Sequence, residues 1–332
     1  MECIMKRNTT FVFSGGAGRT IAAIPALEKY ARLNPDDDFK VLIHGWCDLY
    51  WSHPILQDRT FDVNQKGSFE LFVKDNNLVS PEPYHRWGYY NQELSLAEAF
   101  DEEINNTDDH SDLDKPNLYV SYDESRKMKA NLKSIVEQTK KEKIVVFQPY
   151  GSTASIENGC FTDPSGRSMY PEDYVKLASH LSQHVTVIYF GAPDIYEFSK
   201  DVYSFNPPAG DLRMYMALIK ECDYFVGCDS VGQHMARAFD KPGLVIMGST
   251  FEKNVSYPDY FTFYRNSNVK VSYNPIRIGG VDCQLVDRKN DGAMKFDDNQ
   301  LQEIFSIIGS KVEPKKQVKK SATNKNGKGF AI

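Results

Sequence analysis

In the second half of the sequence an apolar run ends at Cys228. Two polar residues, Asp229 and Ser230, follow it directly. The run predicts a buried strand, and a helix is expected from about Asp229 to Phe239, so Asp229 or Ser230 can cap it. The free N–H groups of a helix start bind phosphate where parallel strands end. His234 shares the helical face of Ser230. The pattern predicts a phosphate site, although a capped helix with a packed histidine would look the same.

Two further segments combine a predicted strand end with small or hydroxyl residues. Near the N-terminus, the turn Gly15-Gly16-Ala17-Gly18 precedes a predicted helix. Its glycines would let the backbone approach an anion or a sugar, but the order is neither GxGxxG nor a P-loop. In the second half, Ser152 and Thr153 follow a predicted strand and could bond a diphosphate. Each segment is equally consistent with an ordinary turn.

Strands and helices that alternate along the chain would bring these segments together. Strands are expected at 9–13, 39–43, 118–121, 144–148, 185–190, 224–227 and 244–247, with helices at 20–33, 94–104, 127–141, 171–181, 212–222, 229–239 and 299–310. This alternation predicts an α/β protein with parallel sheets. We expect a first Rossmann-like domain at 1–140, a second at 141–310, and a disordered lysine-rich tail at 311–332.

Composition excludes several classes of protein. The chain has 332 residues and a formal net charge of -6, which does not favour a nucleic acid partner, although a local basic groove stays possible. Its six cysteines are scattered and predict neither a zinc site nor a disulfide framework. The sequence has no apolar run of membrane-spanning length and no signal-peptide pattern, so a cytoplasmic location is expected.

Between about Thr9 and Thr250 the sequence resembles the glycosyltransferase family 9 heptosyltransferases. Three segments carry the resemblance: the glycine-rich loop and Pro-Ala-Leu helix at 15–27, Ser-Met-Tyr-Pro at 168–171, and the donor signature at 229–250. The resemblance implies the GT-B fold, in which two Rossmann-like domains face each other across a cleft. It also implies inverting sugar transfer from a nucleoside-diphosphate sugar, with no metal and no other cofactor.

The resemblance places the acceptor on the first domain and the donor on the second. The acceptor loop is then Gly15, Gly16, Ala17 and Gly18, and the residues expected at the donor are Ser152, Thr153, Arg167, Asp229, Ser230, Gly232, Gln233 and His234. The family's opening loop carries two aspartates, one of them the catalytic base. Here Gly16 and Arg19 occupy those positions, and Arg19 is a cation that cannot act as a base. A lipid A core acceptor is therefore not assumed.

The catalytic base must come from elsewhere in the sequence. His44 and Asp48 follow the second predicted strand and are the first candidates, and His85 is the next. Arg19 or Arg167 could join the helix start in holding the leaving diphosphate. Trp87 and its aromatic neighbours could form an acceptor platform, although core packing is the commoner use. Asp36-Asp37-Asp38 is expected to be a solvated turn rather than a metal-binding DxD motif.

Three functions fit the sequence. The first is a glycosyltransferase acting on a glycan or similar hydroxyl acceptor. The second is a glycosyltransferase acting on a modified DNA base, which the lysine-rich tail permits and the acidic body disfavours. The third is a non-catalytic nucleotide-sugar-binding protein, because the expected aspartate is missing.

Overall fold

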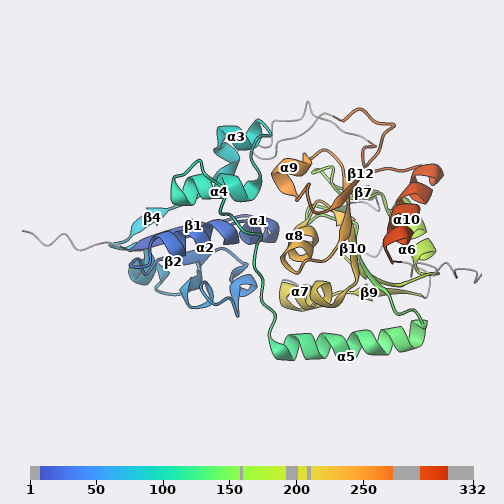
Figure 1. The fold of residues 1–332 in the computed structure, drawn as a ribbon, viewed down its shortest axis with the longest axis horizontal. Helices are drawn as coiled ribbons and strands as arrows, with labels where there is room; N and C mark the ends of the chain where they lie inside the picture. The colour runs from blue at the N-terminus through green and yellow to red at the C-terminus, as the bar shows by residue number, and fades with distance from the viewer. Residues whose placement is uncertain (1–7, 158–159, 192–200, 208–210, 272–291, 313–332) are drawn as a thin grey trace, which may run out of the picture.

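Two parallel sheets follow one another along the chain, and helices cover them (Figure 1). The computed structural model describes residues 8–157, 160–191, 201–207, 211–271 and 292–312. The tail predicted to be disordered lies outside the described residues from 313 onward. The fold class predicted from the sequence, α/β with two Rossmann-like domains, is confirmed.

Sheet A belongs to the first domain and has the strand order β3-β2-β1-β4, with every pair parallel. Its strands are β1 (Thr9–Phe13), β2 (Lys40–Ile43), β3 (Thr60–Asp62) and β4 (Asn77–Val79). The elements around it are α1 (Ala17–Ala22), α2 (Ile24–Leu33), α3 (Trp87–Tyr90), α4 (Leu96–Asn105), η1 (Cys47–Tyr50), η2 (Gln57–Arg59), η3 (Phe69–Val73) and η4 (Pro83–His85).

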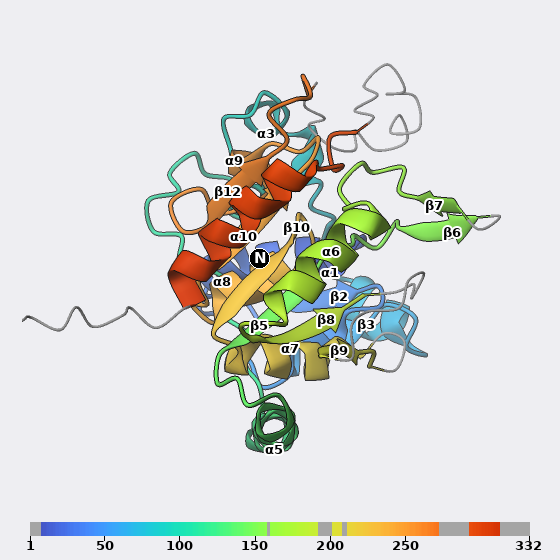
Figure 2. The same cartoon turned by 90° about the vertical axis from the view of Figure 1, so that its right-hand side faces the viewer.

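Sheet B belongs to the second domain and has the order β12-β11-β10-β5-β8-β9, again all parallel. Its strands are β5 (Ile144–Gln148), β8 (Thr186–Phe190), β9 (Val202–Phe205), β10 (Tyr224–Cys228), β11 (Gly243–Met247) and β12 (Thr262–Arg265). The helices near it are α5 (Tyr122–Thr139), α6 (Pro171–Leu181), α7 (Leu212–Glu221), α8 (Val231–Ala238), α9 (Glu252–Val255) and α10 (Asp298–Val312). A hairpin of β6 (Ser155–Glu157) and β7 (Cys160–Thr162) projects beside the sheet (Figure 2).

The central strands β5, β10 and β11 of sheet B are buried on both faces, which is why they are largely apolar in sequence. Val145 and Phe147 belong to a core with α6 and α10, the two helices in front of the sheet in Figure 2. Val146 belongs to another core, shared with α7, α8 and the first domain. Alternate residues of one strand thus fill two cores, and the second core joins the domains.

The helix predicted over 20–33 is divided in two at Ala23. Pro25 explains the break, because proline has no N–H to continue the helical hydrogen-bond ladder and fits best in a first turn. The result is a short α1, whose first residues can face a ligand, followed by a longer α2 that packs on α4.

The long helix α5 lies with the second domain, whereas the predicted boundary at 140 assigned it to the first. It packs on α7 and β8, with Met128 and Leu132 as its buried residues. Ser125 also donates a hydrogen bond to Glu221 of α7 (2.7 Å). We therefore propose that the chain changes domain before α5.

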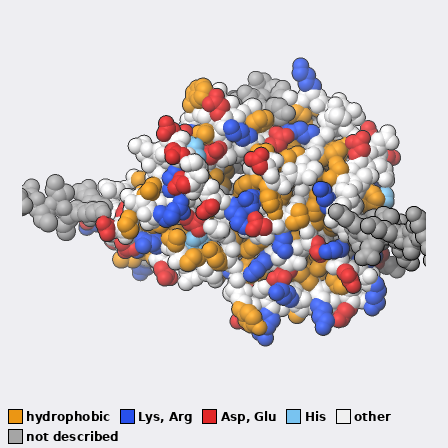
Figure 3. Space-filling model, in the orientation of Figure 1, with side chains coloured by type: hydrophobic (Ala, Val, Ile, Leu, Met, Phe, Trp, Pro, Cys, Tyr) orange, Lys and Arg blue, Asp and Glu red, His pale blue; other side chains and the backbone are white. Residues whose placement is uncertain are grey.

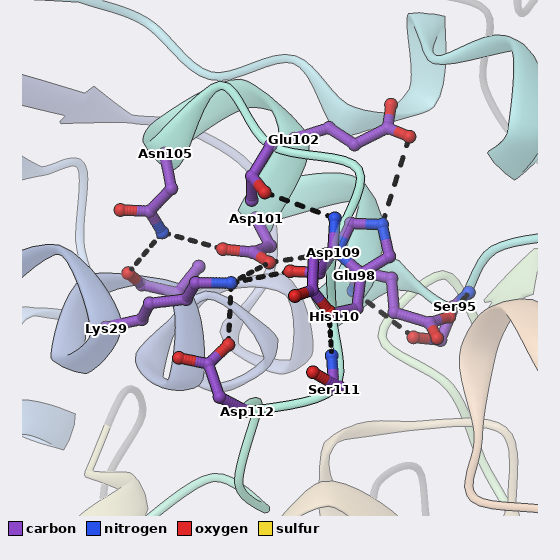
Figure 4. A network of polar contacts seen from close by, with 12 residues as sticks. Lys29, Ser95, Glu98, Asp101, Glu102, Asn105, Asp109, His110, Ser111 and Asp112 are labelled. Atoms are coloured by element: carbon purple, nitrogen blue, oxygen red, sulfur yellow. Dashed lines mark hydrogen bonds and ion pairs between the residues drawn. The ribbon is translucent and has the colours of Figure 1, made fainter.

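The acidic segment after α4 is anchored rather than freely solvated (Figure 4). Asp101, which is fully buried, accepts hydrogen bonds from Lys29 Nζ (3.0 Å) and His110 Nδ1 (2.9 Å). Lys29 also donates to the carbonyl of Asp109 (2.7 Å). Burial alone would lower the pKa of Lys29, but its contacts with Asp112 and Asp101 outweigh burial and raise it. The network fixes this segment against α2 just before the chain crosses to the second domain.

Candidate functional site

A cavity of about 640 Å³ lies between the two domains. The first domain contributes Gly16, Ala17, Gly18, Arg19, Trp46, Tyr84 and Tyr89, and the second contributes Gln148, Tyr150 to Ala154, Arg167, Asp229 to Val231, and His234. The glycine loop follows the carboxyl end of β1, and the second group follows the carboxyl ends of β5 and β10. The three segments singled out in the sequence therefore meet at one cleft, the place where open α/β sheets bind ligands.

The glycine-rich loop forms the floor on the first domain's side. Gly15 has a φ of +101°, which favours glycine, and its carbonyl accepts a hydrogen bond from Trp46 Nε1 (3.1 Å). Gly16, Ala17 and Gly18 line the cavity, whereas Gly15 does not. Trp46, which also lines the cavity, therefore holds the loop at Gly15, and the next three residues face the cleft.

Gly18 sets how closely the two domains approach. A Cβ atom added at Gly18 would lie 2.9 Å from His234 Cδ2 and 3.1 Å from His234 Nε2. The imidazole of His234 is buried, and its Nδ1 lies 2.9 Å from the Tyr257 hydroxyl. Burial, with the charge of Arg167, lowers the pKa of His234 to about 4. His234 is thus a neutral side chain at neutral pH, and it packs from α8 against Gly18 of α1 while lining the cavity.

Gln148 organises the start of α8, a role that the sequence did not reveal. Its Oε1 accepts from Gly232 N (3.0 Å) and Tyr215 OH (2.9 Å). Its Nε2 donates to Ser230 Oγ (3.0 Å) and to the Tyr150 carbonyl (3.2 Å). Gln148, at the end of β5, therefore fixes the start of α8, the helix that follows the neighbouring strand β10.

Two of the predicted donor residues, Gly232 and Gln233, lie behind the cavity lining. The N–H of Gly232 is occupied by Gln148, so it is not free for a phosphate. Gln233 is fully buried, donates to Asp229 Oδ1 (2.6 Å) and the Val255 carbonyl (2.9 Å), and builds the wall behind the cavity. Neither residue lines the cavity, whereas Ser230 does.

Arg167 and Asp229 bring charge to the second domain's side. Arg167 Nη1 donates to the Asp229 carbonyl (3.3 Å) and lies 4.0 Å from Asp229 Oδ2, while Nε donates to Ser165 Oγ (3.0 Å). Burial raises the pKa of Asp229, although the nearby Arg167 and its hydrogen bonds act in the opposite direction. These contacts hold the Arg167 guanidinium in the cavity wall. They use Nη1 and Nε, and they leave its other N–H groups available to a ligand.

Asp163 holds the loop that carries Ser152 and Thr153 in place. The sequence did not indicate this role. It accepts hydrogen bonds from Thr153 Oγ1 (2.6 Å), Ser165 N (2.9 Å) and Ser168 N (2.9 Å). Burial raises its pKa, but these hydrogen bonds outweigh burial and lower it. The Thr153 hydroxyl is therefore engaged, whereas Ser152 is exposed at the cavity.

The predicted catalytic and platform residues lie away from the cavity wall. His44 is exposed, and Asp48 lies in η1, where its carbonyl accepts from Arg213 (3.3 Å). His85 and Trp87 are exposed on η4 and α3, and Trp87 is 64% accessible. None of the four lines the cavity. The structure brings Arg19 to the cavity, but neither of the two preferred bases.

Three further observations bear on the class of site. Among the residues that the structure describes, no three His, Cys, Asp or Glu side chains are grouped as metal ligands would be. The described helices include none that could cross a bilayer. On the face shown in Figure 3, basic and acidic side chains are interspersed rather than gathered into a basic stripe.

Comparison with known proteins gives a likeness of structure rather than of sequence. The sequence matches no protein-family model and no curated protein. The glycosyl transferase family 9 structure from Veillonella parvula DSM 2008 aligns with 91% of this chain and 97% of its own, at a TM-score of 0.64 and 13% identity. The chain has the GT-B fold.

Two other glycosyltransferases share this fold. The ADP-heptose lps heptosyltransferase II of E. coli aligns over 90% of this chain and 99% of its own, with a TM-score of 0.55 and 13% identity. The iron-containing dodecameric glycosyltransferase TibC from enterotoxigenic E. coli H10407 aligns over 92% of this chain and 74% of its own, with a TM-score of 0.56 and 13% identity. The two-domain architecture predicted from the sequence is therefore confirmed for nearly the whole chain.

Proposed function

We propose that this protein is a glycosyltransferase that moves a sugar from a nucleoside-diphosphate sugar to a hydroxyl acceptor, with inversion and without a metal ion. The observation that carries the proposal is the cavity between the two domains. Its volume of about 640 Å³ suits a small-molecule site, and it meets the strand ends of both sheets. The structural neighbours are glycosyltransferases, one of them named for ADP-heptose.

The second domain offers what a leaving diphosphate needs. Arg167 supplies a permanent positive charge, and the α8 start at Ser230 and Val231 supplies the positive end of a helix dipole. The exposed hydroxyl of Ser152 is available to a phosphate oxygen. Such groups act most strongly on charge that develops as the bond to the sugar breaks. We therefore assign the donor to this side and the acceptor to the side of Gly16 to Arg19.

The test is release of nucleoside diphosphate from ADP-sugars and UDP-sugars, mixed in turn with oligosaccharides and with duplex DNA, in the presence of excess chelator. We expect release, with transfer to an oligosaccharide, at the rate seen without chelator. Loss of activity in chelator would contradict the metal-free mechanism, and it is a sharp test because TibC is described as iron-containing. Saturation by DNA alone would favour the modified-base activity. Donor binding without turnover would leave a binding protein.

A further inference from the structure

Trp46 places an aromatic ring at the first-domain wall of the cavity. β1 and β2 are parallel neighbours, so the segments that follow them leave sheet A side by side. Trp46 lies in the segment after β2, and its Nε1 donates to the Gly15 carbonyl in the segment after β1 (3.1 Å). His44 and Asp48, on either side of it in the sequence, do not line the cavity, whereas Trp46 does. The two strand ends therefore bring this indole to the glycine-rich loop.

The indole is held by both its backbone and its ring nitrogen. Gly45, with a φ of +93°, turns the chain after β2, and the Trp46 carbonyl accepts from Leu49 N (3.2 Å) at the start of η1. Part of the ring packs against the core between the domains, and part of it is accessible. Its single polar group, the Nε1–H, is bonded to Gly15. The ring can thus offer a ligand apolar contact and its π system, with little loss of side-chain freedom on binding.

The other aromatic side chains on this wall are buried or already stacked. Tyr89 lines the cavity but is fully buried. The Arg19 guanidinium lies over the ring of Tyr84, 5.0 Å from its centroid. Within the residues that the structure describes, no second ring and no cation stacks on Trp46. Trp46 is therefore the ring on this wall that a ligand can stack against.

The second domain has an aromatic surface of its own. Phe190, at the end of β8, lines the cavity and stacks on Tyr215, with ring centroids 3.6 Å apart. Phe190 shares this side of the cavity with Arg167, which we assign to the leaving diphosphate. A donor base can thus stack on the side that holds its diphosphate, and Trp46 is left for the acceptor.

A sugar ring is the acceptor group that suits this surface. A pyranose has a face of C–H groups and a rim of hydroxyl groups, and the electron-rich face of an indole attracts weakly positive C–H groups. Next to the contact with Gly15, a Cβ atom added at Gly16 would meet nothing within 4 Å, so the cavity has open space there for the hydroxyl rim. A serine or threonine hydroxyl, or an open polyol chain, has no such face to stack.

We propose that Trp46 is the stacking surface for a sugar ring of the acceptor, so that the acceptor class is a carbohydrate; this rests on the proposed function. The indole binds and orients the ring and takes no part in proton transfer. A modified DNA base can stack in the same way, but the formal net charge of -6 opposes binding of a duplex. Trp46 therefore determines specificity, and its removal should weaken acceptor binding without weakening donor binding.

The experiment measures transfer to an oligosaccharide and intrinsic tryptophan fluorescence for the unsubstituted chain, Trp46→Leu and Trp46→Phe. In Trp46→Leu we expect the KM for the oligosaccharide to rise about tenfold or more, with the Kd for ADP or UDP unchanged by calorimetry. Trp46→Phe, which keeps a ring but loses the hydrogen bond to Gly15, should show a smaller rise. Titration with the same oligosaccharide should change the fluorescence of the unsubstituted chain, and this change should be absent from both variants because it reports on the indole.

The matched control is Trp51→Leu, because Trp51 is 54% exposed and does not line the cavity. It should keep both the KM and the fluorescence change. If Trp46→Leu does not fold, Trp46→Phe decides, since a fluorescence change that persists in this variant excludes stacking on Trp46.

The assignment of Trp46 is overturned if Trp46→Leu keeps the oligosaccharide KM or weakens ADP or UDP binding instead. A fluorescence response of the unsubstituted chain to duplex DNA, with none to the oligosaccharide, would also overturn it. If no donor is turned over but the oligosaccharide still changes the fluorescence through Trp46, the proposed function falls and the sugar site stands. If neither turnover nor a fluorescence change is seen, both fall.

Discussion

Gly18 of α1 lies against His234 of α8, and this close approach leaves no room for a side chain at position 18. A methyl group there would lie 2.9 Å from the His234 ring, which is held by Tyr257 and cannot swing away freely. We expect Gly18→Ala to lower the free energy of unfolding by about 1–3 kcal/mol, the usual cost of overpacking. Urea denaturation of the two proteins measures the difference.

Gly16, two residues earlier in the same loop, is the control. A Cβ atom there meets nothing within 4 Å, and its φ of -83° suits any residue. Gly16→Ala should therefore cost less than about 1 kcal/mol, mainly through its position as a helix cap. If Gly18→Ala and Gly16→Ala lowered the free energy of unfolding equally, loop entropy and not the contact with His234 would explain the effect.

At the scale of elements, Gln148 joins the end of β5 to the starts of α8 and of the following loop. Gln148→Ala would leave Tyr215 OH and Gly232 N, both buried, without their acceptor. We expect a loss of about 2–4 kcal/mol in the free energy of unfolding. We also expect weaker donor binding in calorimetry, because Ser230 would lose its partner. If Gln148→Ala lowered stability but left donor binding unchanged, Gln148 would have no role in the donor site.

The elements themselves were largely predictable from the sequence. The apolar runs of β1 and β5 and the Pro171 start of α6 fall where the patterns place them, because burial and proline geometry are local properties. The short strands β3 and β4 were missed, since three residues carry no periodicity. Helix α5 was expected, but not its packing, because only Met128 and Leu132 mark its buried face.

The site was predictable only in part. Strand ends followed by glycine, serine or aspartate indicated the loops that meet at the cavity, because parallel strands end at one edge. Contacts between distant segments left no such signal. Arg19 and Glu82 are 63 positions apart, and Gln148 and Gly232 are 84 apart. The two preferred bases stay predictions: His44 and Asp48 do not line the cavity, although Trp46 between them does, and the Asp48 carbonyl accepts a hydrogen bond from Arg213 of α7.

At the scale of the whole molecule, Arg213 of α7 ties three parts together. It donates to both oxygens of Glu124 on α5 (2.8 and 2.6 Å) and to the carbonyls of Trp51 (3.1 Å) and Asp48 (3.3 Å) in the first domain. The hydrogen bond from Arg213 lowers the pKa of Glu124 to about 2. The Arg213–Glu124 pair therefore contributes to the free energy of unfolding in full above 4.5, the ordinary pKa of glutamate, and this contribution is lost as the pH falls toward 2.

Arg213→Met should therefore lower stability by about 1–3 kcal/mol at pH 7, a range reduced from that of a fully buried pair because Glu124 is partly exposed. It should also remove part of the acid sensitivity between pH 4.5 and 2, and hydrogen exchange should quicken at residues 47–51. Lys129→Met, which removes an exposed ion pair with Glu221 at 3.7 Å, should change stability by less than about 0.5 kcal/mol. Similar losses for the two variants would mean that Arg213 does not join the domains.

The way the chain passes between the domains has a practical consequence. Within the described residues, sheet A and its helices come first, and all strands of sheet B and the helices α5 to α10 follow (Figure 1). A backbone cut between α4 and α5 would thus yield two pieces that each keep a whole sheet. The contacts of Asn254 with the carbonyls of Tyr89 and Leu94 would then have to form between separate molecules. Catalysis by the mixture would rise with the concentration of both pieces, and dilution would switch it off.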